Sequence, residues 1–286
     1  MTPALAESYA WCTRLTRRRA RNFYYGFALL PKPKREAICA IYAFMRHCDD
    51  LSDEPGMGGG RGREMMSRWR AQLEEALAGR PGDHALWPAF LDVVERYRIP
   101  HRYFFEMIEG VSFDLEPHRF TTFDDLYQYC YRVASVAGLT AVHIFGFDSA
   151  DALPLAEKCG IAFQLTNILR DVREDSARGR IYFPLDDMNR HGVTPDEVLR
   201  AARTDGLVQL MRYEAGRARA YYAEATPLVK MVYPESRASL WALIEIYRRV
   251  LDRIEDSNYD VFAGRIRLPA PEKYWIVARS LLRRHV

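Results

Sequence analysis

The chain has 286 residues and 49% of them are hydrophobic, so it is long enough to bury a substantial core. Its 41 basic and 38 acidic residues leave a net charge of only +3, and this weak overall field gives no indication of nucleic-acid binding. The amino-terminal region is charged throughout and the weakly polar run at 133–147 is too short to span a bilayer, so we expect a cytoplasmic protein, at most peripheral to the inner membrane.

Apolar residues recur at helical spacing along almost the whole chain, and the alternating runs typical of strands are nearly absent. The expected helices cover, in chain order, residues 3–30, 34–51, 64–79, 85–97, 101–115, 123–147, 151–176, 195–202, 205–229, 235–256 and 271–283, with a loop through Tyr182 and Pro184. No internal repeat or shift in composition marks a domain boundary. We therefore predict an all-α fold with a single domain over residues 1–286.

The first expected helix carries a cluster of arginines at Arg14, Arg17, Arg18, Arg19 and Arg21. One interpretation is a solvated helix face. The alternative is a surface that binds phosphate groups or contacts anionic lipid, which leaves peripheral membrane contact open.

The first acidic motif closes the expected helix at 34–51. Asp49 and Asp53 lie one helical turn apart, and Asp50 and Glu54 form a second pair with the same spacing. Like charges four residues apart destabilise a helix unless a cation or neighbouring arginines neutralise them. His47 beside this motif is either a metal ligand or, as we favour, a packed histidine.

Two stretches of small residues follow different patterns. The glycine-rich segment at 55–62 lacks the spacing of a phosphate-binding loop and is expected to be a linker or a flap beside the site. Ala134, Ser135, Ala137 and Gly138 instead give one helix a face without bulk. That face suits either close helix packing or a slot for an apolar chain.

The second acidic motif lies in the expected helix at 151–176. Gln164, Asn167, Asp171 and Asp175 are spaced by three, four and four residues, so they share one helix face. Taken alone, this stripe could be a solvated face paired to nearby arginines. Two separate aspartate pairs are more easily explained as a site, because Mg²⁺ binds oxygen ligands through one or two carboxylates together with substrate phosphates.

These features describe an enzyme that ionises a prenyl diphosphate. Metal ions and arginines would stabilise the departing diphosphate, and apolar walls would keep water from the carbocation. The five cysteines are scattered without a C-x-x-C pair, which argues against zinc or a disulfide framework and fits a reducing compartment.

Two longer motifs of the chain resemble signatures of the squalene/phytoene synthase family. One signature is Gly160-x-x-x-Gln164-x-x-Asn167-Ile-x-Arg170-Asp171-Val-x-x-Asp175-x-x-x-x-Arg180-x-Tyr182-x-Pro184. The other is Tyr129-Cys130-x-x-Val133-Ala134-Ser135-Val136-Ala137-Gly138, where Ala137 stands in place of the family's usual Val or Ile. The resemblance covers nearly the whole chain and implies an isoprenoid-synthase helical bundle with a central cavity.

The resemblance also implies roles for individual residues. Mg²⁺, or alternatively Mn²⁺, would be held by Asp49, Asp53, Asn167, Asp171 and Asp175. Diphosphate would contact Arg21, Asn22, Arg46, Gln164, Asn167, Arg170, Tyr247 and Arg265. Tyr129 would lie near the reacting carbons and is expected, with the four aspartates, to be catalytic.

The expected reaction is a head-to-head (1′–1) condensation of two prenyl diphosphates through a cyclopropylcarbinyl diphosphate. The opening Asn22-Phe-Tyr-Tyr-Gly26 and the segment 133–136 are most similar to the bacterial branch that converts farnesyl diphosphate to presqualene diphosphate and squalene for hopanoids. NADPH would be required only if squalene is the final product. The alternatives are a phytoene synthase of carotenoid biosynthesis using geranylgeranyl diphosphate, a class I terpene cyclase, and a non-catalytic assembly factor. The oligomeric state stays open.

Overall fold

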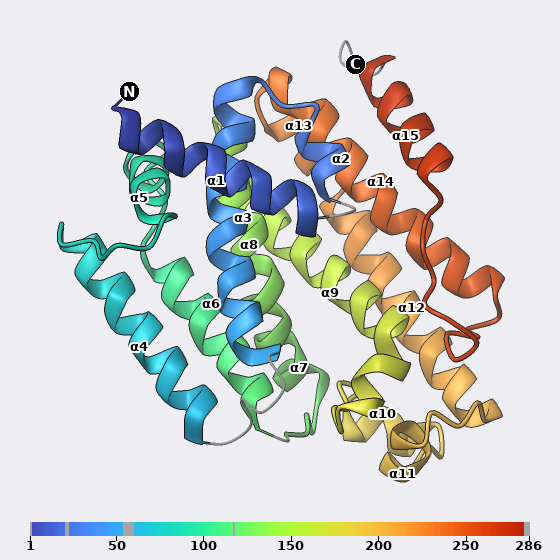
Figure 1. Cartoon of the computed structure of the whole chain (residues 1–286). Helices are drawn as coiled ribbons and strands as arrows, with labels where there is room; N and C mark the ends of the chain where they lie inside the picture. The colour runs from blue at the N-terminus through green and yellow to red at the C-terminus, as the bar shows by residue number, and fades with distance from the viewer. Residues whose placement is uncertain (1, 21–22, 54–59, 117, 283–286) are drawn as a thin grey trace.

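The computed structural model describes residues 2–20, 23–53, 60–116 and 118–282, with the side chains of Asp53 and Leu282 left aside. This part of the chain is built from helices, and its only β-type contact is an isolated bridge between Phe147 and Val232, so the all-α prediction is confirmed (Figure 1). In chain order the helices are α1 (Pro3–Arg19), α2 (Phe23–Phe27), α3 (Lys32–Asp53), α4 (Gly60–Leu77), α5 (Trp87–Arg96), α6 (Arg102–Ser112), the 3₁₀ turn η1 (Phe113–Leu115), α7 (Phe123–Cys130), the π-helical turn η2 (Tyr131–Ser135), α8 (Val136–Phe145), α9 (Ala152–Ala177), α10 (Leu185–Arg190), α11 (Pro195–Leu199), α12 (Asp205–Ala225), α13 (Leu228–Met231), α14 (Pro234–Asp256) and α15 (Ala270–Leu282).

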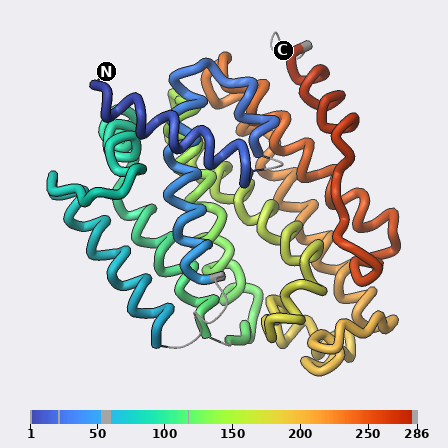
Figure 2. The backbone as a smooth tube through the Cα atoms, viewed as in Figure 1, coloured from blue at the N-terminus to red at the C-terminus, as the bar shows by residue number. Residues whose placement is uncertain are grey.

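Helix α9 forms the centre of the bundle. It packs against α8 and η2 on one side and against α12 and α14 on the other, as the tube in Figure 2 also shows. Buried residues such as Gly160, Ile161 and Thr166 point in different directions around α9, as expected for a helix enclosed by neighbours. Its remaining polar stripe must therefore face an internal space.

Helix α3 is held by an aromatic cluster on one face. Phe44 stacks on Phe90 of α5 with a ring separation of 4.8 Å and meets Phe104 of α6 edge to face at 5.4 Å. Such pairs stabilise by about 0.5–1.5 kcal/mol each beyond the area that they bury. With this face fixed against α5 and α6, the first acidic motif is carried toward the interior of the bundle.

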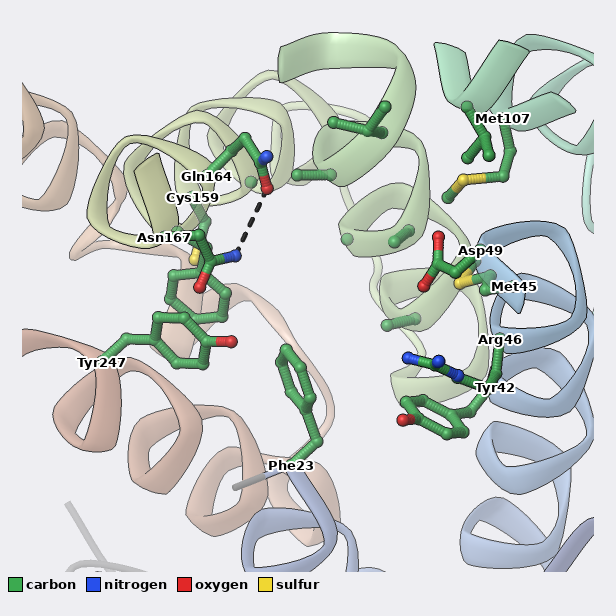
Figure 3. Close-up of a pocket in the computed structure, with 18 of the residues that line it drawn as sticks. Phe23, Tyr42, Met45, Arg46, Asp49, Met107, Cys159, Gln164, Asn167 and Tyr247 are labelled. Atoms are coloured by element: carbon green, nitrogen blue, oxygen red, sulfur yellow. Dashed lines mark hydrogen bonds between the residues drawn. The ribbon is translucent and has the colours of Figure 1, made fainter. Parts of the chain in front are cut away.

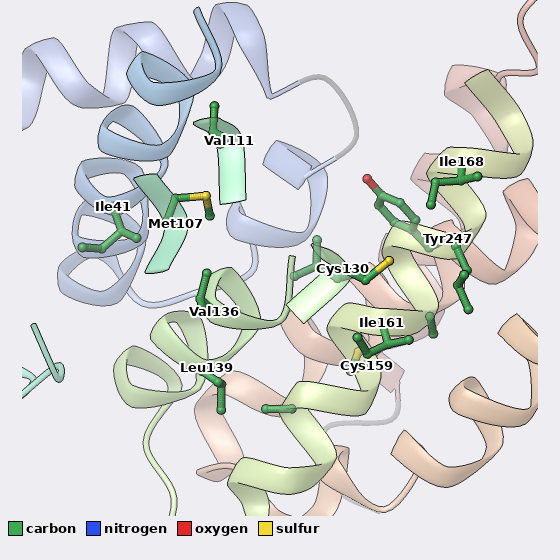
Figure 4. Packing of buried hydrophobic residues seen from close by; sticks show 14 of the residues in the cluster. Ile41, Met107, Val111, Cys130, Val136, Leu139, Cys159, Ile161, Ile168 and Tyr247 are labelled. Carbon is green, nitrogen blue, oxygen red and sulfur yellow. The ribbon is translucent and has the colours of Figure 1, made fainter. Parts of the chain in front are cut away.

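The interior surfaces come from helices far apart in the sequence. In Figure 4, Ile41 of α3 and Met107 of α6 lie on one side, while Ile168 of α9 and Tyr247 of α14 lie on the other. All are buried or line the same internal space.

Several expected boundaries were wrong for local reasons. The expected helix at 205–229 ends at Ala225, because Pro227 lacks the backbone N–H that would continue the helical hydrogen bonding. The glycine-rich stretch at 55–62 lies outside the described residues up to position 59, and Gly60–Gly62 already belong to α4 rather than to a linker.

Part of the loop expected after Tyr182 is the short helix α10. Its buried Asp187 accepts hydrogen bonds from Arg190 at 2.9 Å and from Arg217 of α12 at 3.0 Å. Arg217 also donates to the buried Glu214 at 2.7 Å. This long-range ion-pair network stabilises a turn of helix that local sequence spacing does not predict.

The helix expected at 123–147 is interrupted by the π-helical turn η2. Gly160 of α9 lies against this turn so closely that a Cβ atom there would be 2.4 Å from the Cα of Ser135. Ser135 donates a hydrogen bond to the carbonyl of Glu157 at 2.7 Å. A π turn inserts one residue into the helix and changes which side chains face the neighbouring space, which is why such turns are frequent at functional sites.

Among the described residues, no helix combines the length and apolar character that crossing a membrane requires. The five cysteines are free and buried.

Candidate active site

A cavity of about 700 Å³ lies between α3, α6, η2, α8, α9 and α14. Every predicted site residue whose side chain is described lines it: Arg46, Asp49, Tyr129, Gln164, Asn167, Arg170, Asp171, Asp175, Tyr247 and Arg265. Arg21 and Asn22 lie outside the described residues, as does the side chain of Asp53. The structure thus brings Asp49 of one acidic motif and Asp171 of the other, 122 positions later, to one space.

The α9 side of the cavity carries the amide and carboxylate stripe. Asn167 donates a hydrogen bond through Nδ2 to Gln164 Oε1 at 3.3 Å, as drawn in Figure 3. The Oδ1 atom of Asn167 is buried and has no hydrogen-bond partner among the described residues. A buried acceptor without a donor is unusual, and it indicates a position where a ligand completes the site.

Two arginines hold Asp171 at the end of this stripe. Arg170 donates to Oδ1 at 2.8 Å, and Arg265, from the segment between α14 and α15, lies 3.0 Å from the same oxygen. Burial alone would raise the pKa of Asp171, but the hydrogen bonds and charge of Arg170 together with the charge of Arg265 bring it below the usual value. Asp171 is therefore ionised.

Asp175, one turn further, is in the opposite situation. Burial and the negative charge of Asp171 raise its pKa to about 7, and the charge of Arg180 offsets this only in part. Burial and mutual repulsion disfavour ionisation of all the carboxylates in this cluster at once. A bound cation would stabilise those ionised carboxylates.

The α3 side faces this stripe across the cavity. Tyr42, Arg46 and Asp49 point from α3 toward the α9 side in Figure 3. Arg46 forms an ion pair with Asp50, while its buried Nε has no hydrogen-bond partner among the described residues. This guanidinium is thus held in place by Asp50 and keeps an unused hydrogen-bond donor, as a group that binds an anion requires.

His47 points to the other face of α3. Its ring lies 4.2 Å from that of Trp69 and 5.0 Å from that of His84. Burial, followed by the charge of His84, lowers its pKa to about 4, so it is neutral near pH 7. It does not line the cavity, which agrees with the interpretation as a packed histidine.

Tyr129 belongs to a buried network that sequence reasoning missed. Asp114 accepts a hydrogen bond from Tyr129 at 2.9 Å and another from Tyr182 at 2.8 Å. Arg180 donates to the backbone carbonyl of Asp114 at 2.9 Å. Burial raises the pKa of Asp114 despite the charge of Arg180 and the two phenols. Asp114 lies 15 positions before Tyr129 and 68 before Tyr182, so no periodicity in the sequence links them.

Tyr247 is positioned by stacking. Its ring lies parallel to that of Phe163 of α9 at 4.3 Å and tilted against that of Phe23 of α2 at 5.3 Å. Burial raises its pKa, so the phenol is protonated and can act as a hydrogen-bond donor to a ligand.

The far part of the cavity is apolar. Its lining includes Phe27, Ile38, Ile41, Ala134, Ala137, Gly138, Ala141, Val142, Phe145, Leu228, Leu240 and Leu243. One part of the small-residue stretch packs closely, since Ser135 lies against Gly160, and another part, Ala134, Ala137 and Gly138, lines the cavity. A charged end joined to an apolar end suits an amphiphile with an anionic head.

A divalent cation fits the residues at the charged end. Asn167 offers a buried oxygen without a partner, Asp171 is ionised, and Asp175 lies where positive charge would stabilise its carboxylate. In the part of the chain that the structure describes, no three His, Cys, Asp or Glu side chains converge closely enough to hold a metal ion by themselves. A cation bound here would therefore need further ligands, and Mg²⁺ commonly takes one or two carboxylates together with substrate phosphates.

Comparison with known proteins finds one family over most of the chain. The squalene/phytoene synthase family model matches residues 16–272. A phytoene synthase from Arthrospira platensis is 38% identical, with 100% of this chain and 96% of the relative covered. A 15-cis-phytoene synthase from Synechococcus elongatus is 36% identical, with 98% and 94% covered.

The fold comparison agrees. The crystal structure of a dehydrosqualene synthase in complex with a ligand superimposes with a TM-score of 0.88 at 29% identity, covering 98% of this chain and 97% of that one. Together with the family match over most of the sequence, this shows that the chain belongs to the squalene/phytoene synthase family, as a prenyl-transferring enzyme with the family's helical isoprenoid-synthase fold.

Proposed function

We propose that this enzyme condenses two molecules of geranylgeranyl diphosphate head to head into the C40 hydrocarbon of a phytoene synthase. The observation that carries the reaction type is a single cavity with arginines and carboxylates at one end and an apolar wall at the other. The choice of a C20 substrate is supported by relatives named phytoene synthase that align over the whole chain. This alternative is better supported than the farnesyl diphosphate reading that the sequence alone favoured.

The charged end suits two diphosphate groups. Arg46 reaches it from α3, Arg170 from α9 and Arg265 from the segment before α15. Guanidinium groups bind phosphate oxygens through paired hydrogen bonds that are about twice as strong as neutral ones. We propose that Arg265, now on Asp171, moves to diphosphate when substrate binds, with Tyr247 and Gln164 as further donors.

Asn167, Asp171 and Asp175 on one side and Asp49 with Asp53 on the other would hold Mg²⁺, or Mn²⁺ in its place. The metal would supply positive charge to the diphosphate as its bond to C1 breaks. The opposed placement of the two motifs lets each side serve one diphosphate.

The rest of the cavity wall would protect the carbocation. Phe23, Phe163 and Tyr247 form an aromatic stack beside the charged end, and apolar residues close the far end. These walls exclude water, which would otherwise capture the cation as an alcohol. Asp114 fixes the Tyr129 hydroxyl so that its oxygen can stabilise positive charge near the reacting carbons.

Because the cavity takes its lining from α2 through to the segment after α14, we propose that residues 1–286 act as one catalytic domain. A domain boundary anywhere between α2 and the segment after α14 would place parts of the cavity lining in different domains.

The proposal is tested by incubating the purified protein with Mg²⁺ and either the C15 or the C20 allylic diphosphate, with and without NADPH, and identifying products by mass. A C40 hydrocarbon from the C20 substrate, formed without NADPH, is expected. A C30 diphosphate or hydrocarbon from the C15 substrate alone would return the enzyme to the squalene branch. A cyclised product of a single substrate would contradict head-to-head condensation.

A further inference from the structure

Helix α15 has an outward face that is apolar along its whole length. The exposed positions on it are Pro271, Tyr274, Trp275, Ala278 and Leu281, which we call the outer stripe. They are spaced by three, one, three and three residues, so they share one helix face. Isolated exposed apolar residues are normal, but a continuous stripe of them on one helix indicates a contact surface.

The outer stripe holds the most exposed large apolar side chains of the described chain. Tyr274 is 63% exposed and Trp275 is 53% exposed, and with Leu281 at 42% they make up half of the exposed large hydrophobic residues. The remaining three, Phe113, Tyr213 and Tyr233, lie on separate elements. Tyrosine and tryptophan, with an apolar ring and a polar edge, are the residues that membrane–water interfaces favour.

Two basic residues of α15, Lys273 and Arg279, flank the stripe. The Arg279 guanidinium lies 5.1 Å from the Trp275 ring, and the Lys273 ammonium lies 5.3 Å from the Tyr25 ring of α2. Tyr25 in turn meets Tyr274 edge to face at 5.4 Å. Aromatic side chains flanked by cations are complementary to a lipid bilayer, which has an apolar interior and can carry anionic headgroups at its surface.

The basic end of α1 adjoins α2 from another side. Arg14, Arg17, Arg18 and Arg19 are exposed, and Arg17 donates a hydrogen bond to Tyr24 of α2. Helix α2 lies between the end of α1 and α15 in Figure 1, and it also contacts α15. Arg17 at the end of α1 and the helix that carries the outer stripe therefore both contact α2.

Helix α2 connects this surface to the cavity. Its Phe23 and Phe27 line the cavity wall, while its Tyr24 contacts Arg17 and its Tyr25 contacts α15. We propose that the outer stripe of α15 and the basic end of α1 dock the enzyme on an anionic lipid bilayer, with α2 at the junction between the bilayer and the cavity. The value of such docking rests on the proposed function, in which substrate and product are both lipids.

Vesicle co-sedimentation tests the docking without any prenyl diphosphate, so its result is separate from that of the activity assay. The full-length protein is mixed with vesicles of phosphatidylcholine alone or with added phosphatidylglycerol. We expect binding to the anionic vesicles that weakens as the salt concentration is raised. Salt screens the electrostatic attraction between the basic side chains and the anionic lipid headgroups. Absence of binding to anionic vesicles would overturn the proposal.

Two variants probe the stripe. Tyr274→Ser with Trp275→Ser should lower the partition coefficient roughly tenfold, because two half-exposed rings no longer enter the interface. Ala278→Glu places a negative charge in the middle of the stripe and removes no side-chain contact. It should also weaken binding to anionic vesicles, and this result holds even if the double variant loses its packing against α2. Arg18→Gln and Arg19→Gln should each weaken binding by about fivefold.

Phe113→Ser is the matched control, since Phe113 is 49% exposed but follows α6, away from α15. It should bind vesicles as the unmodified protein does. If the stripe variants bind vesicles normally, the stripe is not the docking face. If they instead abolish a dimer seen by sedimentation velocity in the absence of vesicles, the stripe is a self-association surface and the membrane proposal is wrong.

Discussion

The contact between Gly160 and the π-helical turn allows a sharp prediction for Gly160→Ala. A Cβ atom at this position would lie 2.4 Å from Ser135 Cα, 2.7 Å from Ser135 N and 2.9 Å from the carbonyl carbon of Ala134. These are backbone atoms that cannot rotate away. Since ordinary contacts begin at 3.4 Å, η2 must move by 3.4 − 2.4, or about 1 Å.

The magnitude follows from comparison with a second glycine. Gly216 in α12 has open space around it, with nothing within 4 Å of an added Cβ. Both substitutions gain about 1 kcal/mol from the better helix propensity of alanine. Only Gly160→Ala adds the overpacking penalty of about 1–3 kcal/mol. The difference in unfolding free energy between the two variants should therefore be about 1–3 kcal/mol.

Thermal denaturation and product formation give the two readouts. At about 2 °C per kcal/mol for a chain of this size, Gly160→Ala should melt roughly 2–6 °C below Gly216→Ala. The displaced turn carries Ala134 into the cavity, and a misplacement of about 1 Å can lower turnover by about 100-fold. If the two variants melt together and turn over substrate equally, the tight approach of η2 to α9 does not shape the cavity.

Three other perturbations have defined outcomes. Asp49→Asn and Asp171→Asn should each lower turnover by at least about 100-fold while circular dichroism stays unchanged, because a ligand charge is lost without loss of core volume. Tyr182→Phe removes the 2.8 Å hydrogen bond to Asp114 and should lower kcat more than it raises KM. Burial raises the pKa of Glu214 to about 7, above its unfolded value. The folded state therefore holds this proton longer, and stability should fall as pH rises from about 4.5 to 7, by at most about 3 kcal/mol. Glu214→Gln should remove that part of the decline, as measured by urea midpoints at both ends of the range.

Each of these has a clear contrary result. Near-normal turnover in either aspartate variant would refute the two-sided metal site. An unchanged kcat in Tyr182→Phe would show that Asp114 positions the Tyr129 hydroxyl without the hydrogen bond from Tyr182. Identical pH dependence of the urea midpoint with and without Glu214 would mean that its carboxyl stays ionised beside Arg217 throughout the range.

The sequence was sufficient for the helical class and for the α9 side of the site, since Gln164, Asn167, Asp171 and Asp175 share a face at local spacing. Their opposition to Asp49 across a cavity could be expected only from the resemblance, because no local rule relates α3 to α9. Asp114 was missed because its partners lie far along the chain and nothing around it repeats.

The missed structural details have the same origin. The π turn depends on Gly160, which lies 25 residues after Ser135, and α10 depends on Arg217 of α12. Propensity and periodicity describe contacts within a few residues, whereas these elements are decided by contacts between helices. The sequence alone favoured a C15 substrate, whereas the relatives that align over the whole chain favour the C20 substrate proposed above. Local spacing could not make this choice, because the apolar end of the cavity takes its lining from many helices.

The most direct test of the central claim is a competition for the active site. Equal concentrations of the C15 and C20 allylic diphosphates are offered together with Mg²⁺, and the masses of all products are recorded at low conversion. The account predicts that C40 hydrocarbon dominates over C35 and C30 products, because two C20 chains are the preferred pair. Predominant C30 product would contradict the assignment of substrate, and products built from one chain would contradict head-to-head condensation itself.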